Sequence, residues 1–391
     1  MKRILIFSLA YYPRRVSGAE IALREITDRL DPLLYEFHMV TLRFDARDAR
    51  HERVGNIMVH RVGFGPAYLS KILFIPLSVI QGAYYCQAYR IDAFWAMMTY
   101  MLFPVALLRL IGIRKPYVLT LQDGDPYEKV FGRWFIRPVA PLLNYGFRHA
   151  ATVQAISHYL AQWPKRRGYA GSVEVIYNGA DTNDVVDHFS ERDVAALKQK
   201  LGKKDGDVYL VNTARLEPQK AFDITIRALA LLPQHVSLLI VGSGREEHML
   251  RALAQSLNLE SRVRFIGQVP MSEVTLYRKV SDILVGPSRS EGLGNTFLSA
   301  MASRIPVVAT REGGLAEFVF SGKESGALGQ TAWVVPKDDP EAVARAVSEI
   351  LAHPDTVSTV VARARALIEE KFTWDVVSRE MHARIFTFLS H

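Results

Sequence analysis

Residues 281–317 constrain the fold more than any other segment of the sequence. The apolar run ILVG ends in a Pro-Ser turn and leads to the glycine-flanked acid of EGLGN, the helix-like TFLSAMAS and a second buried strand, PVVAT. Strand, loop, helix and strand in this order predict a βαβ unit. The first backbone N–H groups of such a helix have no partner within the helix, so they face whatever lies beyond the strand ends. With Glu291 among them, this edge suits a ligand that carries both phosphate and hydroxyl groups.

The same alternation of strands and helices runs through the whole chain and restarts once. Strand-like segments of the first half lie at residues 3–8, 37–43, 56–62, 117–123, 151–157 and 173–179. Those of the second half lie at residues 208–215, 236–244, 262–269, 282–288 and 306–310. Because strands that alternate with helices form parallel sheets covered on both faces, we expect two α/β domains. The charged segment 181–207 lacks strand alternation and is expected to connect them, and 372–389 reads as an amphipathic helix.

The composition excludes several classes of protein. With 391 residues, 49% apolar and 23% charged, the chain is globular and longer than a single core usually grows. The single cysteine, Cys86, excludes a disulfide framework or a cysteine-ligated metal cluster and favours a reducing compartment. All of the net charge of +8 lies in residues 1–185, which hold 23 Lys and Arg against 15 Asp and Glu. Such a domain attracts an anionic membrane, nucleic acid or an anionic substrate.

Two long segments, 72–89 and 93–108, carry no charged residue. Each is near or below the roughly 20 residues that a membrane span needs, and Pro76 and Pro104 interrupt them. Three interpretations are open: a buried helix or strand, an apolar surface that rests in a bilayer, and a true span. We expect the whole region 72–113 to be apolar and helical. The N-terminal MKRILIFSLA is too short for a signal peptide and reads as a first strand.

Three loops of the second half, each following a strand, offer groups that could bind a phosphorylated ligand. Arg215 and Lys220 stand five residues apart across a Pro-containing turn and could supply the cations that a diphosphate needs, or be ordinary solvated charges. The GSG at 242–244 could let a base or ribose approach closely, or be a plain turn. Glu291 could accept hydrogen bonds from sugar hydroxyls, or balance a helix dipole near an N-terminus.

Two loops of the first half would reach the same ligand if both domains bind at the carboxyl ends of their strands. Gly18 opens the first helix and would let backbone pass close to a ligand, while Ser17 could serve as the helix N-cap. Gln122, Asp123 and Asp125 follow a strand and could bond sugar hydroxyls or form a solvated turn. The sequence has no HExxH, CxxC or paired-His spacing, so no built-in metal site is expected, and GxSxG is absent.

Four segments taken together resemble the retaining nucleotide-sugar glycosyltransferases of family 4: NTARLEPQKAFDITIRAL, VIYNGAD, LLIVGSG and GPSRSEGLGNTFLSAMASRIPVVAT. The resemblance extends over almost the whole chain, including the YYPRRVSGAE loop, TLQDGD and the C-terminal helix. It implies the α/β GT-B fold, in which two Rossmann-like domains face each other across a cleft. Residues 1–185 would form the acceptor-side domain, 186–371 the nucleotide-sugar domain, and 372–391 a helix that returns to the first domain.

The resemblance also implies an activity, the transfer of a sugar with retention from a UDP- or GDP-sugar to a glycan or lipid-linked acceptor, without a metal or other cofactor. Arg215 and Lys220 would hold the donor diphosphate and Glu291 the donor sugar, and with Gln122 they are the expected catalytic residues. The expected donor-binding residues are Gly18, Gly242, Gly267, Gly292, Leu293, Gly294, Asn295, Thr296 and Ser299. We expect a cytoplasmic protein of cell-surface polysaccharide or glycolipid synthesis, in peripheral contact with the inner face of an anionic membrane and without nucleic acid.

Two positions depart from the pattern of the family. In the family, the second acid of a Glu-x7-Glu pair normally hydrogen-bonds the ribose, and in this sequence that position is Ser299. Gln122 stands where the family usually has the His that ends the TLxD strand. The first change removes one charge-assisted hydrogen bond, worth about 1–2 kcal/mol, and the second removes a group that could change charge near pH 7. A catalytically silent sugar-nucleotide-binding protein therefore stays open, as does a nucleotide-sugar epimerase, which shares the architecture. A nucleic-acid binder explains the charge but not the strand-end loops.

Overall fold

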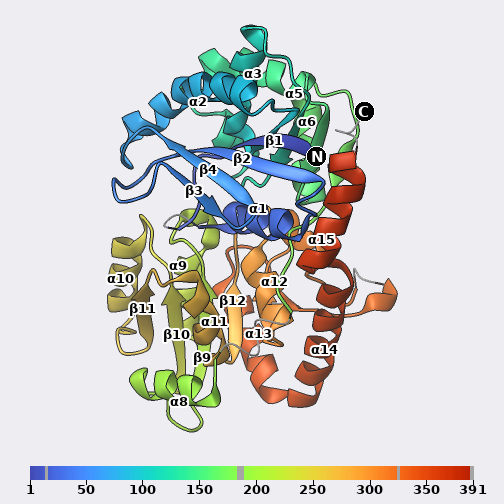
Figure 1. Cartoon of the computed structure of the whole chain (residues 1–391). Coiled ribbons are helices and arrows are strands. Elements are labelled where there is room, and N and C mark those ends of the chain that lie inside the picture. Colours follow the sequence, from blue (N-terminus) through green and yellow to red (C-terminus); the bar gives the residue numbers. More distant parts are fainter. Residues whose placement is uncertain (14–15, 183–188, 324–325, 388–391) are drawn as a thin grey trace. The chain divides into compact units, whose positions relative to one another are not determined.

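The chain folds into two compact units (Figure 1). A computed structural model describes residues 1–13, 16–182, 189–323 and 326–387. Unit 1 comprises Met1–Asn178 together with Trp374–His391, and unit 2 comprises Gly179–Thr373. The domain boundary expected between residues 185 and 186 lies outside the described residues. The segment expected to return to the first domain, from residue 372, contributes Trp374 and the residues after it to unit 1.

Unit 1 is built on an eight-stranded sheet in the order β3-β4-β2-β1-β5-β6-β7-β8. Its strands are β1 (Lys2–Phe7), β2 (Tyr35–Leu42), β3 (His51–Val54), β4 (Ile57–Val62), β5 (Ala93–Met97), β6 (Tyr117–Leu121), β7 (Thr152–Ala155) and β8 (Val173–Val175). All neighbouring strands are parallel except β3 and β4, which pair as an antiparallel edge. The central strands β1, β5 and β6 are apolar runs because helices cover both faces of a parallel sheet.

The helices of unit 1 follow its strands in sequence. They are α1 (Gly18–Arg29), α2 (Tyr68–Ala88), α3 (Leu102–Leu110), α4 (Tyr127–Phe131), α5 (Ala140–Arg148) and α6 (His158–Arg166), with short 3-10 turns η1 (Thr99–Met101) and η2 (Arg137–Val139). The expectation of one apolar helical region over 72–113 is wrong, because strand β5 lies inside it. The sequence of β5, AFWAM, contains no β-branched residue, so its apolar run could not be distinguished from a buried helix.

The C-terminal segment completes the core of unit 1. It consists of α15 (Trp374–Met381) followed by a π-helical turn, η6 (His382–Phe386), where a single amphipathic helix was expected. The buried side chains of Trp374, Met381 and Phe386 belong to the same apolar cluster as β1, β2 and α1. The ring centroid of Phe386 lies 5.1 Å from that of Trp95 in β5. Since burial of one such side chain stabilises a fold by about 1.5–3 kcal/mol, this segment contributes substantially to the stability of unit 1.

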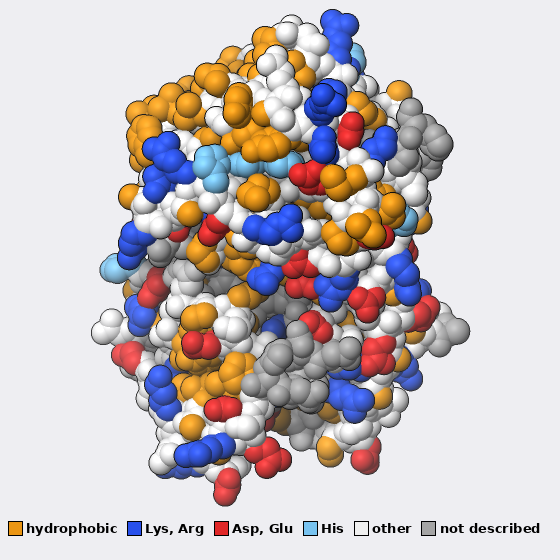
Figure 2. All heavy atoms as spheres, viewed as in Figure 1, with side chains coloured by type: hydrophobic (Ala, Val, Ile, Leu, Met, Phe, Trp, Pro, Cys, Tyr) orange, Lys and Arg blue, Asp and Glu red, His pale blue; other side chains and the backbone are white. Residues whose placement is uncertain are grey.

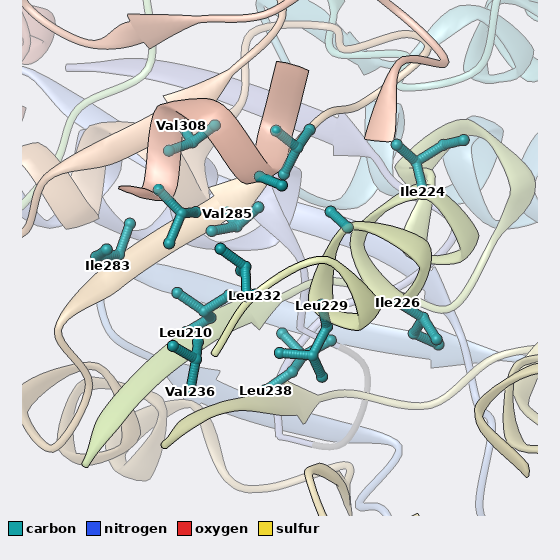
Figure 3. Close-up of a cluster of buried hydrophobic side chains, with 14 of the residues drawn as sticks. Leu210, Ile224, Ile226, Leu229, Leu232, Val236, Leu238, Ile283, Val285 and Val308 are labelled. Carbon is teal, nitrogen blue, oxygen red and sulfur yellow. The ribbon is translucent and has the colours of Figure 1, made fainter. Parts of the chain in front are cut away.

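Unit 2 carries a six-stranded, wholly parallel sheet in the order β11-β10-β9-β12-β13-β14. Its strands are β9 (Val208–Thr213), β10 (Val236–Val241), β11 (Val263–Gly267), β12 (Ile283–Gly286), β13 (Val307–Ala309) and β14 (Trp333–Val334). Its helices are α8 (Glu191–Lys200), α9 (Phe222–Ala230), α10 (Glu247–Ser256), α11 (Met271–Lys279), α12 (Asn295–Ala302), α13 (Pro340–Ala352) and α14 (Pro354–Lys371), with 3-10 turns η3 (Pro218–Lys220), η4 (Gly313–Glu317) and η5 (Gly326–Leu328). Buried side chains of α9 and of the strands belong to one hydrophobic cluster, part of which is drawn in Figure 3.

Both sheets contain a point where the strand order reverses, and this point positions the site. In unit 2 the chain proceeds outward from β9 to β10 and β11, and then crosses to β12 on the other side of β9. In unit 1 it proceeds from β1 to β2, and later crosses to β5 on the other side of β1. The loops after the two central strands diverge there, so ligands of open α/β sheets bind at this point. The loops concerned follow β9 and β12 in unit 2, and β1 and β5 in unit 1.

Candidate active site

The reversal point of unit 2 brings together a lysine and a glutamate that are 71 residues apart in sequence. Lys220, from the loop after β9, donates a hydrogen bond from Nζ to Oε1 of Glu291, from the loop after β12, over 2.6 Å. The side chains are only 14% and 8% exposed. A charge-assisted bond at this distance and burial is among the strong hydrogen bonds of proteins. Two of the four expected catalytic residues therefore form one polar group.

Arg289, which the sequence interpretation did not single out, braces the two loops. Its guanidinium donates to both carboxylate oxygens of Asp223, over 3.0 and 2.7 Å, and to the carbonyl of Pro218 over 2.7 Å. Its backbone N–H donates to the carbonyl of Gln219 over 2.8 Å. A bidentate contact of this kind fixes the orientation of the Arg289 guanidinium as well as its distance from Asp223. Arg289 thus fixes the turn that carries Lys220 relative to the loop that carries Glu291.

A paired-glycine loop closes over the backbone of the acid. The N–H of Gly314, in η4, donates to the carbonyl of Glu291 over 2.9 Å. A Cβ on Gly314 would stand 2.1 Å from the carbonyl oxygen of Gly292, which no side chain tolerates. The close approach of these two backbones therefore requires glycine at position 314.

Helix α12 begins directly after the acid loop and is fastened to β9. Its N-cap is Gly294, whose φ of 102° lies in the left-handed region that favours glycine. The Thr296 hydroxyl is 2.7 Å from both the carbonyl and the hydroxyl oxygen of Thr213, at the end of β9. Ser299 lies one turn further along α12 and is half-buried. The expected donor-binding run of 292–296, which includes Leu293 and Asn295, therefore forms the entry to this helix.

The remaining expected residues of unit 2 lie on the loops after β9, β10 and β11. Gly242 donates its N–H to the carbonyl of Gly267 over 2.8 Å, so the ends of β10 and β11 meet. The 242–244 loop also touches the loop after β9, since Leu216 donates its N–H to the Ser243 carbonyl over 3.1 Å. Arg215 is exposed, and among residues whose placement is described its guanidinium has no hydrogen-bond or ion-pair partner.

In unit 1, Gln122 is a buried and fully oriented side chain. It is 9% exposed, and its amide pairs reciprocally with that of Asn178, over 3.1 Å in one direction and 2.9 Å in the other. The next residue, Asp123, accepts hydrogen bonds from the hydroxyl and the N–H of Thr99, over 2.9 and 3.3 Å. Burial raises the pKa of Asp123 to about 6. The alternative of a solvated turn is therefore wrong for Gln122 and Asp123.

The other expected positions of unit 1 flank this pair. Asp125 forms ion pairs with Lys129 over 2.8 Å and with Arg133 over 3.4 Å. Gly18 is the first residue of α1, after the loop that follows β1, and Ser17 is its N-cap. The N–H of Ser17 donates to the Glu20 carboxylate over 2.7 Å. The N-cap interpretation of Ser17 is confirmed.

Comparison with known proteins identifies the family. The family model "Glycosyltransferase Family 4" matches residues 16–184, and the model "Glycosyl transferases group 1" matches residues 193–367. The chain is 30% identical over 270 residues to a GDP-mannose-dependent alpha-(1-6)-phosphatidylinositol monomannoside mannosyltransferase of Mycolicibacterium smegmatis, covering 66% of this chain and 67% of the relative. The chain belongs to glycosyltransferase family 4. It is an enzyme of the glycosyltransferase class, EC 2.4.

Solved structures show that this glycosyltransferase has the GT-B fold. Sucrose-phosphate synthase from Thermosynechococcus elongatus superposes with a TM-score of 0.84 at 20% identity, covering 100% of both chains. Anabaena HepE in complex with UDP-glucose gives a TM-score of 0.80 at 23% identity, covering 99% of this chain and 100% of that one. The expected fold class is therefore confirmed.

Sequence reasoning on this family 4 glycosyltransferase missed several residues of the site. Ser288 donates to the same oxygen of Glu291 as Lys220 does, and Asn178 and Thr99 hold Gln122 and Asp123. Ser288 stood within the motif GPSRSEGLG, three residues before the acid, but spacing alone gives no direction for a side chain in a loop. Among the described residues, no three His, Cys, Asp or Glu side chains are arranged to hold a metal ion.

Proposed function

We propose that this glycosyltransferase moves a sugar, with retention of its anomeric configuration, from a UDP- or GDP-sugar to a glycan or lipid-linked acceptor. The observation that carries the proposal is the Lys220–Glu291 pair at the reversal point of unit 2, beside the start of α12. A nucleotide sugar has a diphosphate next to a sugar ring. Cation, carboxylate and helix N-terminus are complementary to these two parts.

In the proposed reaction the protein stabilises charge that develops on the leaving diphosphate. Lys220 supplies a cation held in place by Glu291, Arg215 supplies a second and exposed cation, and the N–H groups at the start of α12 add partial positive charge. Glu291 accepts hydrogen bonds from the donor sugar, Ser299 bonds the ribose, and the loop at Gly267 borders the base. Because Lys220 bonds Glu291 directly, binding of the diphosphate and binding of the sugar are coupled through one side chain.

We assign Gln122 to the orientation of the reacting sugar. The reciprocal bonds with Asn178 hold the amide of Gln122 in one direction and use one of its two N–H groups and one of the two lone pairs on its oxygen. An amide can donate a hydrogen bond to a sugar hydroxyl but cannot take up a proton at neutral pH. The acceptor therefore has to lose its proton to another group, such as a donor phosphate oxygen.

The choice of donors and acceptors is supported by the relatives. The Mycolicibacterium smegmatis relative is named as dependent on GDP-mannose and as acting on a phosphatidylinositol monomannoside, and HepE was solved with UDP-glucose. Rhizobium leguminosarum LpcC, a lipopolysaccharide core biosynthesis mannosyltransferase, is 39% identical over 148 residues, or 36% of this chain and 40% of the relative. We propose a role in cell-surface polysaccharide or glycolipid synthesis on the cytoplasmic side.

The test is a panel of UDP- and GDP-sugars incubated with purified protein and lipid extracts or oligosaccharides, with product and free nucleoside diphosphate measured. We expect turnover with one donor and a loss of at least about 100-fold in Glu291→Gln and Lys220→Ala, as for other charge-stabilising groups. Lys200→Ala, on the exposed face of α8, serves as the matched control. Nucleotide binding without any turnover would favour the silent binding protein, and conversion of the donor sugar without an acceptor would favour an epimerase.

We also propose that unit 1 contacts an anionic membrane through α2. This helix is long and apolar enough to cross a membrane, yet it packs one face on unit 1 through Phe74, Gly82 and Tyr85. The opposite face exposes a stripe of large apolar side chains, Tyr68, Leu69, Ile72, Ile80 and Tyr84, which are 52–66% exposed. Figure 2 shows apolar side chains gathered over α2 with basic groups at their margin. An apolar stripe with basic neighbours is typical of helices that lie in the headgroup layer.

Liposome co-sedimentation tests this contact. We expect binding to vesicles that contain anionic lipid, weakening as salt is raised, and loss of binding in the double variant Leu69→Asp and Ile72→Asp. Leu351→Asp changes an exposed leucine of unit 2 in the same way and serves as the control. Equal binding of both variants would overturn the assignment of α2.

A further inference from the structure

The carboxylate of Glu291 is held by one of its two oxygens. Lys220 Nζ and Ser288 Oγ both donate to Oε1, over 2.6 and 2.9 Å. Ser288 and Glu291 are both buried, so these two bonds lie where little solvent reaches them. Neither bond uses Oε2. A carboxylate that is fixed through one oxygen in this way keeps the other in a defined direction.

Ser288 is itself anchored to the neighbouring strand. It lies two residues beyond the end of β12, and its carbonyl accepts a hydrogen bond from the Thr310 hydroxyl over 2.6 Å. Thr310 directly follows β13 and is 1% exposed. The parallel pairing of β12 and β13 therefore sets the position of the Ser288 hydroxyl, and through it the position of the Glu291 carboxylate.

The two donors to Oε1 differ in what else they can bind. In the proposed function Lys220 also serves the donor diphosphate, whose charge competes with Glu291 for the ammonium group. The Ser288 hydroxyl has one proton, and that proton is committed to Glu291. When phosphate draws Lys220 away, Ser288 is the donor that still fixes the carboxylate.

We infer that Ser288 is a positioning residue that holds Glu291 in its sugar-binding direction while Lys220 engages the diphosphate, and that Thr310 supports it. The inference rests on the proposed function, since it assigns the sugar to Glu291 and the diphosphate to Lys220. A positioning role predicts that two affinities respond differently when the hydroxyl is removed, whereas a purely structural role predicts that both fall together. Loss of the hydroxyl weakens recognition of the sugar, while recognition of the bare nucleoside diphosphate persists.

The experiment compares Ser288→Ala with Ser288→Thr, which keeps the hydroxyl. Affinities for UDP and GDP, and for the donor sugar nucleotide found in the panel, are measured by titration calorimetry, together with kcat and KM. For Ser288→Ala we expect nucleoside diphosphate affinity within about twofold of wild type, and a loss of about tenfold to 100-fold in kcat/KM, the range for a hydrogen bond to a charged group. Ser288→Thr restores most of the rate, and Thr310→Val shows a smaller loss of the same kind.

Ser281→Ala is the matched control. Ser281 lies two residues before the start of β12, is also buried, and donates to the carbonyl of Tyr277 over 2.8 Å. Its loss therefore tests the general effect of removing a buried serine hydroxyl. Unchanged kinetics in Ser288→Ala would overturn the inference. So would an equal loss of affinity for nucleoside diphosphate and sugar nucleotide, or a Ser288→Thr variant as impaired as Ser288→Ala. A wild-type protein that binds no sugar nucleotide would instead refute the proposed function, and the inference with it.

Discussion

We predict that a row of three imidazoles at the edge of unit 1 makes the stability of this unit depend on pH. His60 in β4 lies between His38 and His51, with ring nitrogens 3.1 Å apart on one side and 2.9 Å on the other. It is 2% exposed, and its ring lies 4.1 Å from that of Tyr85 in α2. The carboxylate of Glu36 contacts the outer imidazole of this row, with 3.1 Å between its Oε1 and His38 Nε2. Burial, with smaller contributions from the neighbouring imidazoles, lowers the pKa of His60 to about 4.

The magnitude follows from proton linkage. Above pH 6.5 His60 is neutral in both the folded and the unfolded chain, so it adds no pH dependence. Below pH 6.5 His60 is protonated in the unfolded chain, whereas in the folded chain it stays neutral down to about pH 4. Because the unfolded state binds more protons in this range, the free energy of unfolding falls as the pH falls. The loss is about 2 kcal/mol at pH 5 and about 3 kcal/mol below pH 4. For a unit of about 200 residues, 2 kcal/mol lowers the melting temperature by about 4–8 °C.

The assay is scanning calorimetry of the wild type and His60→Gln at pH 7.5 and pH 5. Glutamine keeps a donor and an acceptor but does not titrate, so the variant should lose about 4–8 °C less than the wild type between the two pH values. Comparing the two changes removes the contributions of other groups, including the opposite slope of Asp123. His149→Gln, which alters an exposed histidine of the same unit, should behave like the wild type. An equal drop in all three proteins would refute the linkage.

Three further variants test particular contacts. Asp123→Asn should stabilise the protein by about 1–3 kcal/mol at pH 7.5 and by about half as much at pH 5, because burial raises the pKa of this carboxyl to about 6 and the unfolded chain gains more than the folded chain from its ionisation; calorimetry at both pH values checks the sign and the ratio. Phe386→Ala should cost about 3–5 kcal/mol in urea unfolding, since it empties a buried site against Trp95. Gly314→Ala should destabilise unit 2 by about 1–3 kcal/mol or more, because the new Cβ meets the carbonyl of Gly292; a melting curve unchanged within error would contradict this.

The fold was predictable where local patterns repeat. Alternating strands and helices gave two parallel sheets, and the expected strand 208–215 overlaps β9. Patterns failed where a strand lacks β-branched residues, as in β5, and where a strand is very short, as in β14 at Trp333–Val334. Neither segment is long enough for periodicity to emerge.

The site was predictable as a set of loops but not as a set of contacts. The strand-end rule placed Lys220 and Glu291 at one edge, yet their bond depends on β12 crossing to the far side of β9. The roles of Ser288 and Thr310 depend on the register between β12 and β13. The alternative of a solvated turn stayed open for Gln122, because its partner Asn178 is 56 residues away in the sequence. Such pairings are properties of the tertiary structure, and no local pattern encodes them.

The return of the C-terminal segment to unit 1 has a consequence for how the protein is made. Residues 1–178 are synthesised first. The side chains between Trp374 and Phe386 that complete the core of unit 1 emerge only after residues 179–373 have been synthesised. Until then, the apolar surface around Trp95, which this segment later covers, is exposed to solvent in the nascent chain. Domains otherwise tend to fold from the N-terminus as they appear. Here unit 2 is the first unit whose residues have all been synthesised, and unit 1 can complete its own core only after the C-terminal segment has emerged.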